Sequence, residues 1–176
     1  MHFGFASTHP TIVTTGVGCY GAPVPNYRRC HVPGGTFFFT VNLADRRARL
    51  LVDRINDVKR AYASVVRERP VETLALCVLP NHLHAVWQLP DGDADYALRW
   101  QLIKTRFTRA VPDAPAGRRP GERGVWQRRF YERWLRDDRQ LSAAIDYTHG
   151  NPVRHGLVRD IRDWPHSTWH RERVQR

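Results

Sequence analysis

Residues 80–87 read PNHLHAVW and place two histidines, His82 and His84, on either side of one apolar residue. The apolar residues among and after them are typical of a strand, and successive side chains of a strand point to opposite faces of its sheet. His82 and His84 should therefore project together from one face, while we expect Leu83 to turn into the core with Val86. Two neutral imidazoles side by side can form two corners of a divalent-metal site.

Two further runs predict neighbouring strands. Residues 71–79 are mostly apolar, and only two residues separate them from His82. So close a connection predicts an antiparallel hairpin. Residues 36–43, TFFFTVNL, are aromatic and β-branched and follow a Gly-Gly pair, which predicts another strand.

Three stretches have apolar residues at helical spacing: 50–69, which ends before a proline, 95–110 and 138–150. The order is strand, helix, strand, strand, helix, followed by the third helical stretch. This order predicts a small α+β sandwich in which the helices pack on one face of an antiparallel sheet.

The third helical stretch contributes a tyrosine and an amide. Tyr147 and Asn151 are four residues apart, so they share one face of a helix. If this helix crosses the histidine face, the Asn151 carbonyl could be a third metal ligand while the phenol faces a phosphate. Pro152 biases the preceding residue away from helical backbone, so we expect the helix to end there.

Composition indicates a folded domain and excludes several classes of protein. Hydrophobic residues make up 41% of the 176 residues, which is globular. The three cysteines form no C-x-x-C pair, so neither a disulfide framework nor a zinc finger follows. No apolar run approaches the roughly 18 residues that span a membrane, and the start of the chain lacks the basic residues of a secretory signal. We expect a cytoplasmic protein.

The beginning of the chain differs from the rest. Residues 1–26 are rich in Gly, Thr, Pro and Ala without sustained periodicity. We interpret them as a disordered extension, or as translated sequence ahead of the true start. Residues 27–176 form the single catalytic domain in this interpretation.

The basic charge favours a nucleic-acid partner. The formal net charge is +11, and Lys59 and Lys104 are the only lysines among the 28 basic residues. Arginine suits bidentate contact with phosphate, although a GC-rich genome would produce the same bias. Residues 97–136 contain eleven basic and three acidic residues, a net of +8, with aromatic residues interleaved. This mixture suits single strands or hairpin ends. The alternatives are a solvated basic surface and aromatic side chains in the core, where we expect Phe107 and Phe130.

Together these residues indicate phosphodiester chemistry. A cation would neutralise the charged phosphate oxygens and fix the geometry. An activated Tyr147 phenol could then attack and form a tyrosyl phosphodiester, which conserves the bond energy so that the strand can be rejoined. Each signal has an ordinary alternative: solvent-facing histidines on a strand, a structural tyrosine, and an Asn-Pro helix stop at Asn151.

Several blocks of sequence are similar to one known family. Residues 79–84, LPNHLH, resemble the HUH motif of single-tyrosine transposases. The later blocks VWQRRF, IDY, NPVRHG and DWPHST, and the earlier YRR and GGTFFFTVNL, resemble REP-associated tyrosine transposases. The matching blocks occur in order from about residue 26 to residue 170.

The resemblance implies a ferredoxin-like fold with a central antiparallel sheet and helices packed on it. It implies Mg²⁺ or Mn²⁺ held by His82 and His84, with Asn151 as the polar ligand, and Tyr147 as the nucleophile. It also implies metal-dependent nicking and strand transfer on single-stranded REP hairpin DNA through a 5′-phosphotyrosine, by a monomer or, alternatively, a dimer. Tyr131 stands where the family pattern predicts tryptophan and is a rival nucleophile.

The expected DNA contacts lie at the start of the domain and in the basic-aromatic segment. They are Tyr27, Arg28, Arg29, Lys104, Arg106, Trp126, Arg128 and Arg129. The sequence is also compatible with two other functions. One is a protein that binds palindromic hairpin DNA without cutting it, and the other is a metal-dependent hydrolytic nuclease that leaves no protein-linked product.

Overall fold

The computed structural model describes residues 29–117 and 123–171. The chain divides into a unit of residues 1–30 and a unit of residues 31–176, and the strands and helices below belong to the second. The predicted extension, 1–26, lies outside the described residues, so its disorder stays a prediction. No helix in the described part of the chain has the length and apolar character needed to cross a bilayer.

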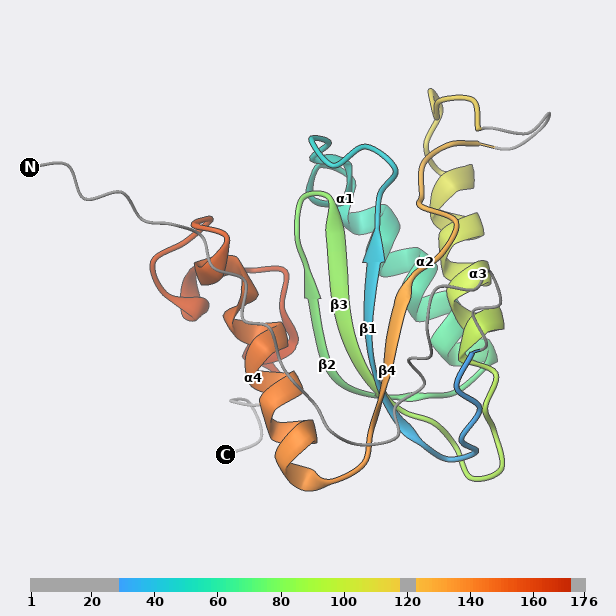
Figure 1. Ribbon diagram of the computed structural model, residues 1–176. Helices are drawn as coiled ribbons and strands as arrows, with labels where there is room; N and C mark the ends of the chain where they lie inside the picture. Colours follow the sequence, from blue (N-terminus) through green and yellow to red (C-terminus); the bar gives the residue numbers. More distant parts are fainter. Residues whose placement is uncertain (1–28, 118–122, 172–176) are drawn as a thin grey trace, which may run out of the picture. The chain divides into compact units, whose positions relative to one another are not determined.

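A four-stranded antiparallel sheet forms the centre of the domain, with strand order β2-β3-β1-β4 (Figure 1). The strands are β1 (Thr36–Asn42), β2 (Glu72–Val78), β3 (His82–Gln88) and β4 (Tyr131–Leu135). The predicted β2–β3 hairpin is confirmed. Strand β4 was not predicted, because its sequence YERWL mixes charged and aromatic residues and gains its order from pairing with β1.

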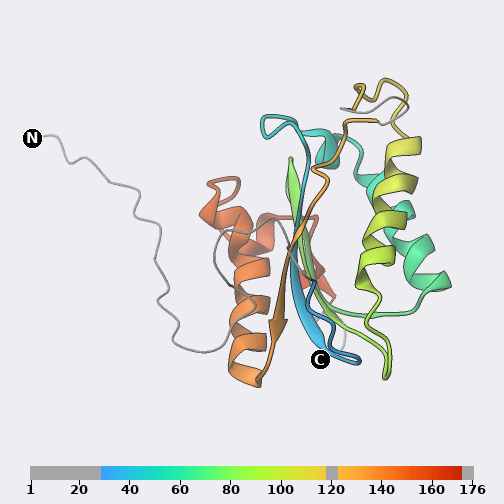
Figure 2. The same cartoon turned by 45° about the vertical axis from the view of Figure 1, so that its right-hand side comes forward.

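Helices cover both faces of this sheet, as Figure 2 shows. Helices α2 (Ile55–Glu68) and α3 (Tyr96–Arg109) pack on one face, and α4 (Asp138–Arg154) packs on the other. The expectation that all helices share one face was therefore wrong. Strands β1 and β3 carry apolar side chains on both faces, so each face needs a cover. The series β1-α2-β2-β3-α3-β4 is the ferredoxin-like arrangement, to which α4 is added.

The predicted helix over 50–69 is two helices. A short α1 (Leu50–Asp53) is separated from α2 by Arg54, whose φ of −115° and ψ of 34° are not helical. Leu51 is buried under the β2–β3 connection, where its backbone N–H donates to the Pro80 carbonyl at 3.1 Å. This contact holds α1 against the β2–β3 connection.

The face toward α2 and α3 holds a core of fully buried rings. Trp87 stacks on Trp100 with ring centroids 4.3 Å apart, and Phe39 packs against both. Phe107 and Phe130 are also buried, as predicted. Leu83 faces this core, but Val86 does not, because residues 82, 84 and 86 share one parity of the strand. Val86 instead packs on the α4 side.

Helix α4 is anchored at both ends. Its N-cap residue Asp137 accepts a hydrogen bond from the Gln140 backbone N–H at 2.8 Å, while Leu141 and Ile145 pack on the sheet. The helix continues through Pro152 to Arg154, so the expected end at Asn151 was wrong. A proline removes a single helical hydrogen bond, and here tertiary contacts outweigh that loss. The chain after α4 covers the β2 edge, where the Val78 N–H donates to the His166 carbonyl at 2.9 Å.

Candidate active site

The two histidines lie side by side on β3 and face α4. The ring centroids of His82 and His84 are 4.9 Å apart, and the side chains are 5% and 3% exposed. Strand alternation therefore places both imidazoles on one face, as predicted, and α4 excludes water from them.

Burial keeps both imidazoles neutral. It lowers the pKa of His82 to about 4, with the positive charges of His155 and Arg46 contributing further. It lowers the pKa of His84 to about 3, helped by neighbouring His82. At neutral pH both rings therefore have a nitrogen lone pair available for a cation, with almost no competition from protons.

Hydrogen bonds fix which nitrogen is available. The Asn81 Oδ1 can only accept, so His82 Nδ1–H donates to it at 2.6 Å. His84 Nδ1 lies 3.0 Å from Thr40 Oγ1. Both contacts engage Nδ1, so Nε2 is the nitrogen that remains for a ligand. The Asn81 amide is itself held, because its Nδ2 donates to the Arg46 carbonyl.

The side chain of Asn151 is buried beside the two histidines, and its oxygen lacks a hydrogen-bond partner. Its side chain is 1% exposed and lies close enough to both imidazoles to oppose the lowering of their pKa. Neither Asn151 Oδ1 nor His84 Nε2 has a hydrogen-bond partner of ordinary length and angle. A buried imidazole nitrogen and a buried amide oxygen without partners are costly unless another group binds them. These donors fit a divalent cation.

The candidate donor set consists of two imidazoles and the Asn151 amide, and it includes no acidic side chain. Within residues 29–117 and 123–171, no three His, Cys, Asp or Glu side chains come together to hold a metal ion. Two imidazole nitrogens and one amide oxygen leave most positions of an octahedral ion to water and substrate oxygens. This is the composition expected of a reactive site rather than a structural one.

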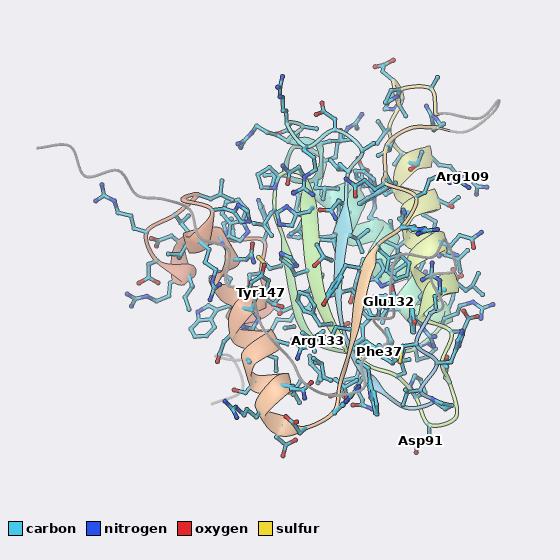
Figure 3. All side chains as sticks on the ribbon, viewed as in Figure 1. Phe37, Asp91, Arg109, Glu132, Arg133 and Tyr147 are labelled. Carbon is cyan, nitrogen blue, oxygen red and sulfur yellow. The ribbon has the colours of Figure 1, made fainter. Side chains whose placement is uncertain are left out.

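Tyr147 lies beside the histidines. Its ring centroid is 5.3 Å from that of His84 and 5.7 Å from that of Phe38, and 39% of its surface is exposed. The guanidinium carbon of Arg154 lies 5.0 Å from the Tyr147 ring centre. The Tyr147 ring therefore packs against the imidazole of His84, so α4 and β3 meet at this point. Figure 3 labels Tyr147 on α4.

The predicted DNA contacts do not form one cluster. Arg128 and Arg129 are exposed and follow Gln127, whose backbone N–H donates to the carbonyl of Asn42, the cross-strand partner of His82. Lys104 donates to the Gln127 carbonyl at 2.5 Å, and Trp126 Nε1 donates to the Lys104 carbonyl at 3.2 Å. These two residues thus fasten the segment to α3. Tyr27 and Arg28 lie outside the described residues, and Arg29 belongs to the unit 1–30.

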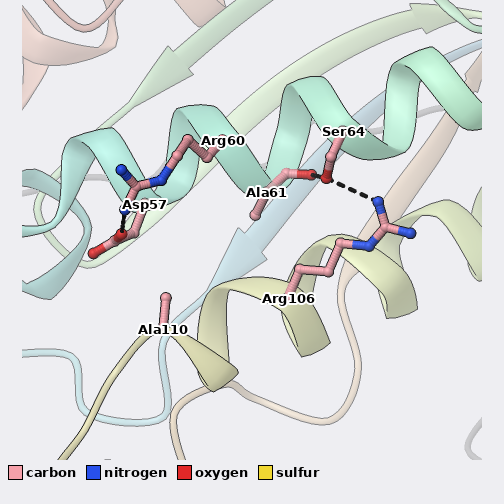
Figure 4. A pocket seen from close by; sticks show the side chains of 6 residues that line it. All are labelled: Asp57, Arg60, Ala61, Ser64, Arg106 and Ala110. Carbon is pink, nitrogen blue, oxygen red and sulfur yellow. Dashed lines mark hydrogen bonds and ion pairs between the residues drawn. The ribbon is translucent and has the colours of Figure 1, made fainter.

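Arg106 lies across the sheet from the histidines. It pairs with Glu68 and donates to Ser64 Oγ at 2.8 Å. These contacts border a cavity of about 250 Å³ between α2 and α3 (Figure 4). The cavity contains no group of the site described above. DNA contact by Arg106 stays a prediction, and its observed role is to join two helices.

Sequence reasoning missed four residues of the site. Asn81 directly precedes His82 and could have been recognised as a partner for the imidazole. Arg154 and His155 follow Tyr147 by seven and eight residues, a helical spacing, and the His155 ring is 5.2 Å from that of His82. The assumed helix end at Asn151 concealed them. Thr40 required the β1–β3 register, which pairs it with His84.

Comparison with known proteins gives a consistent result. No family model matches the chain. A protein of Haemophilus influenzae that carries the name REP-associated tyrosine transposase is 43% identical over 152 residues, covering 84% of this chain and 86% of the relative. The REP-associated tyrosine transposase of Escherichia coli is 43% identical over 146 residues, 83% of each chain.

A solved structure is also similar. The structure of a REP-associated tyrosine transposase bound to a REP hairpin superposes with a TM-score of 0.77 at 42% identity and covers 86% of each chain. The similarity therefore extends over most of both chains.

Proposed function

This chain belongs to the REP-associated tyrosine transposases, and from that premise we propose that it nicks and rejoins single-stranded REP-type hairpin DNA through a covalent 5′-phosphotyrosine. The hairpin follows from the solved relative, which was captured bound to a REP hairpin. The strongly basic chain, with a formal net charge of +11, is complementary to such a partner.

One observation carries the proposal. The Tyr147 phenol, 39% exposed, lies against His84, whose Nε2 shares a buried space with the Asn151 oxygen. A nucleophile accessible to DNA is thus placed next to two buried polar atoms, His84 Nε2 and Asn151 Oδ1, that have no hydrogen-bond partner. A phosphate seated there would touch both the nucleophile and the donor set.

The residues of the site have different roles in this proposal. Mg²⁺ or Mn²⁺ held by His82, His84 and Asn151 would neutralise the scissile phosphate and polarise its P–O bonds. Asn81 and Thr40 orient the imidazoles. Arg154 adds a positive charge at the face of the nucleophile.

The covalent step balances without any further reactant. The Tyr147 oxygen attacks the phosphorus and loses its proton to solvent, while the bond to the 3′ oxygen breaks. The products are a 5′-phosphotyrosine and a free 3′-hydroxyl, which takes up a proton. Attack by a 3′-hydroxyl on the phosphotyrosine reverses the step and restores a phosphodiester.

A labelled REP-type hairpin oligonucleotide incubated with Mn²⁺ tests the assignment on a denaturing gel. We expect a protein–DNA adduct with the wild type and with Tyr131→Phe, and none with Tyr147→Phe. The Tyr131 variant is a matched control, because this second tyrosine is exposed on the same face of the sheet. An undiminished adduct with Tyr147→Phe would refute the role of that phenol.

Metal removal separates this function from the alternatives. In EDTA, or with His82→Ala, we expect the adduct to disappear while hairpin binding persists. A wild type that binds the hairpin equally with and without metal, and never forms an adduct, would be a binding protein. Cleaved DNA without attached protein would indicate a hydrolytic nuclease.

A further inference from the structure

Helix α4 covers only part of its face of the sheet. It lies over β2 and β3 and contacts β4 near its own start, where Leu135 packs against Leu141. The beginning of β4 is not covered in this way. Tyr131 is 42% exposed there, and Arg133 is also exposed, although its guanidinium donates to Gln140 Oε1 of α4 at 3.4 Å.

The strand register places these side chains on the histidine face. Thr40 is the cross-strand partner of both Tyr131 and His84, and directly paired residues share a face. Phe38 in the same way pairs with both Arg133 and Val86. Tyr131 is therefore two strand spacings from His84, about 10 Å.

Ring contacts link this area to the nucleophile. The Phe38 ring centroid lies 6.2 Å from that of Tyr131 and 5.7 Å from that of Tyr147, on which it packs edge to face. One aromatic side chain thus joins the two tyrosines. A strand whose phosphate reaches Tyr147 would pass over Tyr131 if it continued toward β4.

The charge of this area suits a phosphate backbone. Arg133 projects from β4 on the side of Tyr147, and the intervening acid, Glu132, projects to the opposite side (Figure 3). Glu132 is buried next to the hydroxyl of Tyr96. The only acidic residue of β4 is therefore screened from this face, which presents an aromatic ring beside a guanidinium.

We propose that Tyr131 and Arg133 form a binding platform for the single-stranded nucleotides next to the scissile phosphate. The base stacks on Tyr131, and Arg133 holds the adjoining phosphate. Stacking platforms flanked by arginines bind single strands with little dependence on sequence. The inference rests on the proposed function, because it places the flanking strand relative to Tyr147.

The test uses the full-length protein and a REP-type hairpin oligonucleotide with 2-aminopurine beside the scissile phosphate, in EDTA so that no cleavage occurs. Binding is followed by fluorescence, which stacking changes. We expect Tyr131→Ala to weaken binding about 5- to 100-fold and to abolish the fluorescence change. Tyr131→Phe, which keeps the ring, should behave as the wild type.

A charge series tests the phosphate contact. Arg133→Gln should reduce the slope of log affinity against log salt by about 0.7, as expected for one lost contact to a single strand. Arg109→Gln is the matched control, since Arg109 is exposed on α3 across the sheet, and it should leave the slope unchanged.

Three results would overturn the platform: wild-type fluorescence and affinity in Tyr131→Ala, equal losses in Tyr131→Phe and Tyr131→Ala, or equal salt slopes in the two arginine variants. The adduct assay reports separately on Tyr147. A normal wild-type adduct together with any of these results would remove the platform and leave the proposed function standing. If the wild type forms no adduct but the variants show the expected binding losses, the proposed cleavage is removed, and Tyr131 and Arg133 are left as a surface that binds single-stranded DNA.

Discussion

The two faces of the central sheet differ in how they are covered. Toward α2 and α3, β1 and β3 contribute tightly packed rings such as Phe39 and Trp87, which are fully buried. Toward α4 the same strands contribute Thr40, His82 and His84, and the helix leaves the beginning of β4 exposed. One face therefore holds the domain together, while the other keeps unsatisfied polar atoms and an accessible tyrosine.

This difference shows how a small domain tolerates a costly site. Burying polar atoms without partners is unfavourable, and here the opposite face of the same strands provides the compensating apolar burial. Alternation along β3 sends Leu83, Ala85 and Trp87 to one side and the histidines to the other. Changes on the first face should affect folding, and changes on the second should affect chemistry.

The largest expected effect on stability is that of Trp87→Ala. This residue stacks on Trp100, and its Nε1–H donates to the Tyr62 hydroxyl at 2.6 Å. We expect a loss of about 3–5 kcal/mol in the free energy of unfolding, measured by urea denaturation. The paired variant His84→Ala should cost less than about 1 kcal/mol yet eliminate the adduct. Equal destabilisation by the two would remove the distinction between the faces.

Acid should destabilise the protein through the histidine face. The pKa values of His82 and His84 are about 4 and about 3 in the folded state, against 6.5 as the ordinary value. Between pH 6.5 and pH 4 the unfolded state therefore binds more protons, so stability falls as pH falls, by up to about 1.4 kcal/mol per pH unit for each group. Above pH 7.5 the pair contributes no pH dependence.

Denaturation midpoints measured in EDTA from pH 8 to pH 5 check this slope. A variant with both histidines replaced by Gln should lose most of it. If the stability of that variant falls as steeply toward low pH as that of the wild type, other groups control the acid sensitivity.

A smaller effect, on metal affinity, is expected at Asn81. This residue is not one of the proposed metal donors His82, His84 and Asn151. Removing the acceptor that holds His82 Nδ1–H frees the ring to rotate and to change tautomer. Asn81→Ala should weaken Mn²⁺ binding about 10- to 100-fold by calorimetry while leaving the unfolding free energy within about 1 kcal/mol. Asn81→Asp, which keeps an acceptor, should restore most of the affinity. Unaltered Mn²⁺ affinity in Asn81→Ala would exclude this orienting role.

The smallest effects compare two helix caps. Asp137 caps α4 and Asp95 caps α3, each accepting a backbone N–H of its own helix. Replacing either by Ala should cost about 1 kcal/mol. Because α4 carries Tyr147 and Asn151, hydrogen exchange in α4 should rise and adduct formation should slow only in Asp137→Ala. If adduct formation slows equally in Asp95→Ala and Asp137→Ala, this asymmetry is contradicted.

Much of the architecture could be predicted from periodicity, and the failures have definite causes. The β2–β3 hairpin, α3 and the paired histidines follow from local spacing and are observed as expected. Strand β4 could not be predicted, because its charged residues conceal a pattern that only pairing with β1 reveals. The end of α4 was wrong because a local proline rule was outweighed by packing.

The sequence by itself determined that His82 and His84 share a face and that Tyr147 and Asn151 share a helix side, because the periods of strand and helix are fixed by backbone geometry. Only the tertiary structure decided that these two faces meet, that α4 lies opposite α2 and α3, and that Tyr131 and Arg133 stay exposed. Side-chain spacing constrains a single element. Which elements pack together depends on how the whole chain buries its apolar surface.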